Sequence, residues 1–217
     1  MGMSQFPCLI RSATAGGEAR YALGVPLVDS YLAFVAGRSR PNALRAVAHD
    51  LKTFLSVIDK EPVEVVPVDI FGFVALQRGD RTVMRISDGE SGLSARTIAR
   101  RLSSISGLYA YLVARGDTAV TVNPVPRGLS TRRRGGRRQV PLVRVPRTLP
   151  KILWPAEVTA LLGALATDRD RAMVYAMVLG GLRRCEVLGL TLGDIQVPER
   201  SLFIAEGKGG HQRVIRS

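Results

Sequence analysis

The chain has 217 residues, 46% of them hydrophobic, and a formal net charge of +13 at pH 7. This length and composition are typical of one large globular domain or two small ones, and they exclude a chain that is disordered throughout. The positive charge favours a polyanionic partner, either nucleic acid or an anionic membrane surface.

Most of that charge lies in one short segment. Residues 1–124 carry a net charge of +3 and residues 151–217 carry +2, whereas residues 125–150 hold 8 arginines and no acidic residue. A basic run on its own is usually a solvated tail. Because this one lies between two segments with ordered patterns, we interpret it as a strap across a phosphate backbone.

Neither the cysteines nor the apolar runs indicate a secreted or membrane protein. Cys8 and Cys185 lack the spacing of a disulfide framework or a zinc site. No run approaches the roughly 18 consecutive apolar residues of a membrane span, and the N-terminus lacks the features of a signal peptide. We therefore expect a soluble protein of the reducing cytoplasm.

The first half of the chain predicts a small helical bundle. Residues 1–24 show no periodicity and are predicted to be a flexible arm. In residues 25–124 apolar residues recur at helical spacing in four segments, without strand-like alternation. Pro41 and Pro67 suit first helical turns, and Ser94 is a candidate N-cap. The four stripes are Val28, Tyr31, Leu32 and Val35; Leu44, Val47, Leu51, Phe54, Leu55 and Ile58; Val68, Ile70, Phe73, Val74 and Leu76; and Ile98, Leu102, Ile105, Tyr109 and Leu112.

The last of these helices has a polar face that suits a DNA groove. Small residues beside arginines would let the helix backbone approach the groove while guanidinium groups reach phosphates or base edges. A plain solvated face is the alternative, and the pattern does not separate the two. The residues of this face are Arg96, Arg100, Ser103 and Gly107, flanked by Arg101 and Ser104.

Residues 125–150 predict a linker between two domains. Their glycines, prolines and arginines cannot build a core, so we expect an extended or disordered segment until a partner binds. If about six arginines neutralise phosphates, the log–log salt slope of DNA binding should be roughly −5, at about −0.9 per contact. The candidate DNA-binding residues of this linker are Arg132, Arg133, Arg134, Arg137 and Arg138.

Residues 151–217 predict a second, mixed domain. A helix should begin at Pro155, a second should start near Asp170, and a third should start near Arg183. Two β-rich runs, residues 201–205 and 213–216, flank a glycine-rich segment and predict a β-hairpin.

Arg183 and Lys208 are the residues of this domain that suit chemistry on a phosphodiester. Phosphate transesterification requires fixed positive charge at the developing pentacoordinate phosphorus and a proton for the departing oxygen. The planar fork of Arg183 suits a grip on two phosphate oxygens. Lys208, in a glycine-rich turn that can lie close to DNA, would protonate the leaving oxygen.

At these motifs the chain resembles the tyrosine recombinases, which include the phage integrases. Gly181-Leu-Arg183-x-x-Glu186 is similar to the motif that carries the first catalytic arginine, and Gly207-Lys208-Gly-Gly to the hairpin that carries the catalytic lysine. The resemblance implies a mainly α fold with a small β-hairpin. It would comprise a helical, SAM-like core-binding domain over residues 25–124, the linker, and the N-terminal portion of an α+β catalytic domain over residues 151–217.

The same resemblance implies roles for individual residues. Arg183 would bind the phosphate, Lys208 would be the general acid, and Glu186 would be an accessory residue beside the arginine. Arg184 would serve the surface or the DNA backbone. An ordinary turn lysine is the alternative for Lys208, and an i,i+3 partner of Arg183 is the alternative for Glu186. Duplex DNA at a recombination site would be the partner, with no metal and no cofactor.

The chain departs from this family in two motifs. The later motif with a second arginine and its histidine is absent, and His49 and His211 are expected on the surface instead. All five tyrosines precede Lys208, so none occupies the place of the family's nucleophile near the C-terminus. Without it no 3′-phosphotyrosyl intermediate can form within this polypeptide, and we expect binding without cleavage.

Two hypotheses for the function follow. The first is a C-terminally incomplete recombinase, and the second is a non-catalytic DNA-binding protein that occupies recombination sites. RNA binding is disfavoured because Tyr109 and Tyr111 are interpreted as core and rim aromatics, which leaves no aromatic platform among the basic residues. We expect a monomer without DNA and allow a homo-oligomer on DNA.

Overall fold

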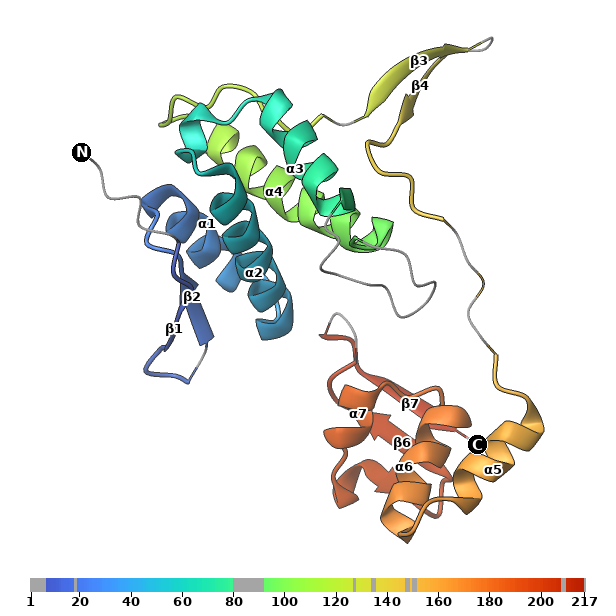
Figure 1. Ribbon diagram of the computed structural model, residues 1–217. Coiled ribbons are helices and arrows are strands. Elements are labelled where there is room, and N and C mark those ends of the chain that lie inside the picture. The colour runs from blue at the N-terminus through green and yellow to red at the C-terminus, as the bar shows by residue number, and fades with distance from the viewer. Residues whose placement is uncertain are drawn as a thin grey trace. The chain divides into compact units, whose positions relative to one another are not determined.

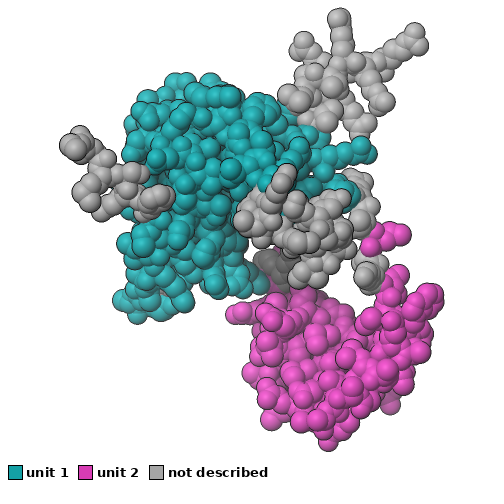
Figure 2. Space-filling model, in the orientation of Figure 1, with its two compact units in different colours: residues 1–147 teal, residues 148–217 magenta. Residues whose placement is uncertain are grey.

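The structure falls into two units, Met1–Arg147 and Thr148–Ser217, which Figure 2 shows in separate colours. We call them the helical unit and the mixed unit. This computed structural model describes residues 7–17, 19–79, 92–126, 128–133, 136–146, 149, 152–207 and 210–216, with the backbone alone described at 129–133 and 136–140.

Four α-helices, among the described residues, build the helical unit as the periodicity predicted (Figure 1). Helices α1 (Pro26–Ala36) and α2 (Pro41–Ile58) begin at prolines, whose missing N–H suits a first turn. A short 3-10 helix, Pro62–Glu64, leads to α3 (Pro67–Gly79), and α4 spans Ala95–Arg115.

Helix α4 begins and ends where its local sequence predicts. Ser94 Oγ accepts the Thr97 N–H at 3.2 Å, which satisfies one of the free donors of the first turn. Gly116 adopts a φ of 70°, the left-handed conformation that commonly ends a helix. The predicted apolar stripe between them is buried along its length: Ile98, Leu102, Ile105, Tyr109 and Leu112.

The core of this unit is formed by the inward faces of the four helices. Phe54 of α2 and Phe73 of α3 meet edge to face, with ring centroids 5.3 Å apart. The stripe of α3 is narrower than predicted, because Val68 and Leu76 are exposed.

Tyr109 connects α4 to the 3-10 helix through a buried hydrogen bond. Its ring is fully buried, and its hydroxyl donates to the Pro62 carbonyl at 3.0 Å. Burial raises the pKa of Tyr109, so the phenol stays protonated and remains a donor.

Residues 7–17 and 19–24 of the N-terminal arm contain a β-hairpin, which the sequence analysis did not predict. Strands β1 (Ile10–Ala13) and β2 (Ala19–Ala22) form an antiparallel hairpin. Leu23, which follows β2, is buried at 3% exposure, and its N–H donates to Asp29 Oδ1 of α1 at 2.6 Å. The hairpin therefore packs on the helices. Four-residue strands of mixed polarity carry too little alternation to be predicted.

The linker also contains regular structure, which the sequence analysis did not predict. Strands β3 (Leu129–Arg133) and β4 (Gly136–Val140) pair antiparallel over five residues each. Figure 1 shows them as a two-stranded ribbon, and both strands belong to the helical unit.

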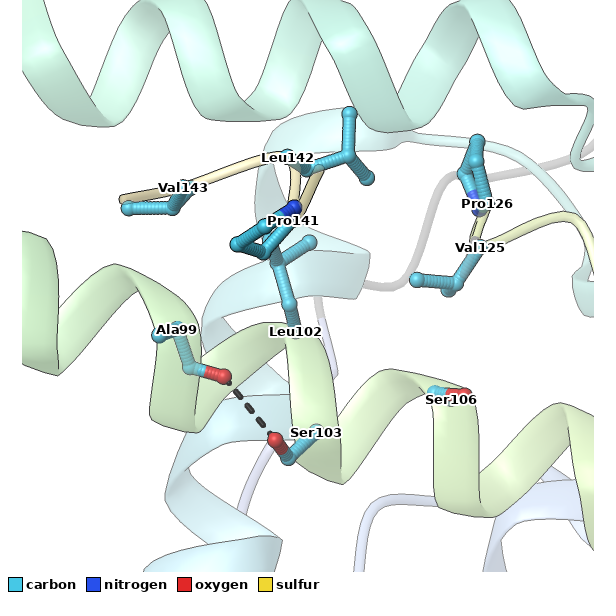
Figure 3. Close-up of a pocket in the computed structure, with 9 residues that line it drawn as sticks. All are labelled: Ala99, Leu102, Ser103, Ser106, Val125, Pro126, Pro141, Leu142 and Val143. Atoms are coloured by element: carbon cyan, nitrogen blue, oxygen red, sulfur yellow. Dashed lines mark hydrogen bonds between the residues drawn. The ribbon is translucent and has the colours of Figure 1, made fainter. Parts of the chain in front are cut away.

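The residues just before β3 and just after β4 are anchored in the helical core. Val125 and Val143 are buried within it, at 8% and 5% exposure. Between them and α4 lies a pocket of about 390 Å³ (Figure 3). Its walls are Ala99, Ser103 and Ser106 of α4 on one side and Pro126, Pro141 and Leu142 on the other.

The mixed unit contains the helices and both strands that were predicted. Its helices are α5 (Pro155–Gly163), α6 (Asp168–Val178) and α7 (Arg184–Leu188), followed by a 3-10 helix at Leu192–Asp194. Strand β5 (Ile195–Gln196) was not predicted. The predicted hairpin forms from β6 (Ser201–Ile204) and β7 (Arg213–Arg216), and the sheet order is β5-β6-β7, all antiparallel.

The core of the mixed unit is small. Leu182, Val187 and Ile204 are its buried apolar residues, and Met173 and Leu190 pack against them. Large apolar side chains such as Leu192 remain exposed, some of them beside a pocket between α6 and the sheet. In the part of the chain that the structure describes, no helix is both long and apolar enough to cross a membrane.

Candidate functional site

Arg183 is placed by a tight glycine turn between α6 and α7. Gly181 adopts a φ of 62°, and a β-carbon at Gly180 would lie 2.8 Å from the Ala176 carbonyl oxygen. The Leu182 N–H donates to that same carbonyl at 3.3 Å, so the chain reverses directly after α6. The turn thus requires glycine at both positions, and it sets Arg183 at the N-cap of α7.

Glu186 joins Arg183 to a second arginine, Arg213 of β7. Glu186 Oε1 accepts Arg183 Nη1 at 2.9 Å and Arg213 Nη1 at 3.1 Å. Glu186 Oε2 accepts the Arg183 backbone N–H at 2.8 Å and Arg213 Nη2 at 2.8 Å. Each carboxylate oxygen thus receives two hydrogen bonds, which fills the acceptor capacity of the group.

Burial and hydrogen bonding fix the charge of this cluster. The Glu186 side chain has 0% exposure, whereas those of Arg183 and Arg213 have 52% and 36%. The backbone N–H of Arg183, with the two guanidinium groups, lowers the pKa of Glu186 to about 2 against the opposing effect of burial. The cluster therefore carries two cations and one anion and presents a net positive charge to solvent.

Glu186 is thus more than the i,i+3 partner of Arg183 that the sequence offered as an alternative. It also connects α7 to β7 through its hydrogen bonds to Arg213. The sequence analysis gave Arg213 no role, because no local pattern relates position 213 to position 186.

Lys208 lies outside the described residues, but the residue before it borders the cluster. A β-carbon at Gly207 would lie 3.6 Å from Arg213 Nη1 and 2.4 Å from the His211 carbonyl oxygen. The Gly207 N–H donates to that carbonyl at 3.0 Å. The glycine is therefore required for the turn between β6 and β7, and the backbone that leads into Lys208 runs beside Arg213.

The neighbours of Arg183 and the two histidines lie on the surface. Arg184 and Cys185 are exposed on α7. His49 and His211 are exposed, as predicted. Within the described ranges, no cluster of three or more His, Cys, Asp or Glu side chains could hold a metal ion.

The side of α4 that was predicted to face DNA is only partly exposed to solvent. Arg96 and Ser103 are exposed, and Ser103 also lines the pocket under the linker. Gly107 instead faces α1, because a β-carbon there would lie 2.5 Å from the Tyr31 hydroxyl oxygen. The glycine therefore serves helix packing.

The other polar residues of that face surround a buried carboxylate, Asp50 of α2. Asp50 has 2% exposure, and its Oδ2 accepts Arg100 Nη1 at 2.6 Å and Ser104 Oγ at 2.8 Å. Arg101 Nε lies 3.8 Å from Asp50 Oδ1, and Arg101 Nη1 donates to Gln77. Arg101 and Ser104 thus turn toward the interior, contrary to the sequence interpretation, while the Arg100 side chain keeps 49% exposure.

An aromatic cluster does lie among basic residues, which corrects another expectation. Phe34 and Tyr111 stack with centroids 5.0 Å apart, Arg38 lies over Phe34, and Arg115 lies over Tyr111. Tyr111 is half-buried at the rim, as predicted, and also contacts Tyr31. The two stacked rings are 77 positions apart in sequence, so no local pattern could reveal their contact, although each arginine lies only four residues after its ring.

The linker arginines occupy register positions in the ribbon. Arg132 and Arg133 are in β3, and Arg137 and Arg138 are in β4. Arg134 lies outside the described residues.

Comparisons with known proteins all point to the tyrosine recombinases and phage integrases. Residues 151–216 match the sequence pattern of the phage integrase family. A tyrosine recombinase XerC of Thermodesulfovibrio yellowstonii is 30% identical over 179 residues, which cover 80% of this chain and 51% of that protein. A tyrosine recombinase XerC of Xylella fastidiosa is 31% identical over 196 residues, covering 87% and 59%.

A solved structure supports the same fold. The XerH site-specific recombinase bound to its difH substrate aligns with a TM-score of 0.52 at 16% identity, covering 89% of this chain and 52% of that one. The chain spans about half the length of the relatives that it matches.

Proposed function

Because this chain belongs to the tyrosine recombinase family, we propose that it binds duplex DNA and that its mixed unit supplies part of a site for cutting and rejoining a DNA strand. The observation that carries the proposal is the Arg183–Glu186–Arg213 cluster beside the turn that leads into Lys208. The relatives' names refer to recombinases, and the basic charge of the chain suits a polyanion.

The cluster suits the binding of a phosphodiester. A guanidinium has five N–H donors, and Glu186 occupies one of those of Arg183, so further donors remain for phosphate oxygens. The remaining net positive charge would stabilise the charge that develops on the oxygens in a pentacoordinate transition state. Since Glu186 fixes the arginine before DNA binds, little reorganisation is needed during the reaction.

The reaction of the whole enzyme would be a transesterification through a 3′-phosphotyrosyl intermediate. A tyrosine oxygen attacks the phosphorus, the P–O5′ bond breaks, and Lys208 gives its proton to the departing 5′ oxygen. The five tyrosines here all precede Lys208. We therefore propose that these 217 residues alone bind without cleaving, which also fits a DNA-binding protein that merely occupies recombination sites.

The residues outside the mixed unit would add contacts to the DNA backbone. Arg96 and Arg100 of α4 are exposed, and the ribbon carries four more arginines. We further propose a monomer in the absence of DNA and a location in the cytoplasm, where the DNA of a bacterial cell or its phage is found.

Binding of a mixed-sequence duplex, measured by fluorescence anisotropy, tests the phosphate site. Arg183→Ala should weaken binding about tenfold more than Arg216→Ala, since a charge-assisted hydrogen bond contributes about 1.5–3 kcal/mol. Arg216 is a matched control because it is an exposed arginine of the same unit and lies outside the cluster. Equal losses for the two variants would make Arg183 an ordinary surface cation.

Trapping of covalent adducts tests the second half of the proposal. The duplex is incubated with the protein, the mixture is denatured, and protein–DNA adducts are sought by gel and mass spectrometry. No adduct should appear. A phosphotyrosyl adduct at any of the five tyrosines would refute binding without cleavage.

A further inference from the structure

The arginines of the ribbon occupy both of its faces. The register pairs Arg132 with Arg137, and residues paired across an antiparallel ladder share a face. Because successive residues alternate between faces, Arg133 and Arg138 fall on the other one. No acidic residue is present anywhere in residues 118–156 to neutralise them.

Because these arginines repel one another, an anionic partner would stabilise the ribbon. Like charges at directly opposed positions disfavour strand pairing, as with Arg132 and Arg137. A two-stranded hairpin is also at best marginally stable in water by itself. An anionic partner that reaches both faces would remove the repulsion, whereas a single row of phosphates along one side would neutralise one face only.

The ribbon is also held at its base. Val125 and Val143 are buried at the two ends of the segment, and Arg78 Nη2 donates to the Leu142 carbonyl at 3.5 Å. On the other side, the Asn123 side chain donates to the Ser106 carbonyl of α4 at 2.9 Å. The helical unit therefore presents the ribbon from two fixed points, which a strap lying along a DNA backbone would not require.

The dimensions of a two-stranded ribbon select the groove. Its strands lie about 4.8 Å apart, and five residues extend about 17 Å. The major groove of B-DNA is about 12 Å wide and admits such a ribbon. The minor groove, about 6 Å wide, takes a ribbon when the duplex is bent and widened, often by inserted apolar side chains, and the ribbon's paired positions are mostly arginine and other polar residues. The major groove of A-form RNA is too narrow and deep to be read in this way.

We propose that the β3–β4 ribbon enters the major groove of duplex DNA, where its arginines contact the O6 and N7 acceptors of guanine as well as phosphates. Arginine pairs bidentately with these two acceptors. The inference rests on the proposed function as a DNA-binding protein, and it replaces a strap along the backbone with a ribbon that reads bases.

The test compares a mixed-sequence duplex with the same duplex carrying 7-deazaguanine in place of guanine, which lacks the N7 acceptor. The wild-type chain should bind the 7-deazaguanine duplex about fivefold more weakly, equivalent to about 1 kcal/mol. Four lysines in the matched variant Arg132→Lys, Arg133→Lys, Arg137→Lys, Arg138→Lys keep the charge but lose the bidentate geometry. Because an ammonium can still donate a hydrogen bond to N7, that variant should show a smaller loss on the 7-deazaguanine duplex than the wild-type chain does.

The alanine counterpart of these four substitutions separates charge from base reading. It should lose the guanine dependence and also lower the steepness of the log–log salt dependence by roughly 3 to 4, at about 0.9 per contact. The ribbon lies outside the helical core, and unchanged amide exchange in α2 and α4 will show that the variants are folded.

Each alternative result has a distinct meaning. Equal binding of both duplexes by the wild-type chain would overturn the ribbon proposal and leave DNA binding intact. Equally tight binding of an A-form RNA duplex of the same sequence would also overturn it. Failure to bind any duplex would overturn the proposed function itself, and the ribbon proposal with it.

Discussion

Asp50→Ala should destabilise the helical unit by about 3 kcal/mol. The substitution removes the acceptor of Arg100 Nη1 and of Ser104 Oγ. Hydrogen bonds to a charged group contribute about 1.5–3 kcal/mol each, and removal of one partner of a buried pair costs about 3–5 kcal/mol. We take the low end because the Arg100 side chain is half exposed and can be hydrated again.

Arg101 accounts for much of this loss. Its Nε is buried and has no hydrogen-bond partner among the described residues, so the nearest compensation for its charge is the Asp50 carboxylate, 3.8 Å away. Burial lowers the pKa of Arg101, and Asp50 opposes that effect. Removing the carboxylate therefore leaves a partly buried cation without compensation.

Native-state amide exchange of α2 and α4 in the full chain measures the effect. A loss of about 3 kcal/mol should accelerate the slowest amides by roughly a hundredfold, since about 1.4 kcal/mol corresponds to a factor of ten. Combining Asp50→Ala with Arg101→Ala should recover part of the loss, because the uncompensated charge is removed.

A surface pair provides the control. Asp117→Ala also removes a carboxylate paired with an arginine, Arg115, but Asp117 keeps 54% side-chain exposure. Its loss should be much smaller, because a solvent-exposed ion pair contributes little to stability. If Asp50→Ala cost no more than Asp117→Ala, the argument from burial would be refuted.

Three further predictions concern single groups. The pKa of Glu186 is about 2 in the folded protein and 4.5 for an ordinary glutamate. The ionised carboxylate therefore stabilises the mixed unit fully above about pH 4.5, and this stabilisation is lost as the pH falls toward 2. In urea unfolding measured at a series of pH values, Glu186→Gln should make the free energy of unfolding depend less on pH between these two values. Gly207→Ala should lower the stability of the mixed unit by about 1–3 kcal/mol and speed amide exchange in β6 and β7, because the new methyl clashes with the His211 carbonyl. Gly193→Ala is the control and should be neutral, because a methyl fits at that position. Tyr109→Phe should lower the free energy of unfolding of the helical unit by about 1–3 kcal/mol, since the buried Pro62 carbonyl loses its donor, and an unchanged denaturation midpoint would contradict this.

The helices could be predicted from the sequence because the apolar spacing and the capping residues of a helix are local signals. The stripe from Ile98 to Leu112, the Ser94 cap and the Gly116 stop needed no knowledge of the tertiary structure. Arg183 was singled out because a guanidinium suits phosphate binding, and Glu186 because their shared motif resembles that of the tyrosine recombinases. The sequence did not predict β1 and β2, whose four-residue strands carry little pattern.

The misplaced polar residues of α4 carried a signal that could have been used. Asp50 lies three residues after Val47 and four before Phe54, which puts it on the apolar face of α2. Arg101 lies three residues after Ile98 and four before Ile105, and so borders the apolar stripe of α4. A carboxylate on the apolar face of α2 and a cation beside the apolar face of α4 predict a buried ion pair. The sequence analysis missed this pair because it placed all the arginines of α4 on one outward face.

One device recurs in both units: a buried carboxylate that receives two arginines while a guanidinium remains partly exposed. Asp50 holds Arg100 in this way, and Glu186 holds Arg183. Each cluster keeps net positive charge, so attraction to a polyanion survives the ion pairing. Immobilising a free arginine on binding costs about 0.5–1.5 kcal/mol. Because folding has already fixed these side chains, a phosphate that meets them would not incur that cost, and the buried carboxylates therefore contribute to binding although they would never touch the DNA.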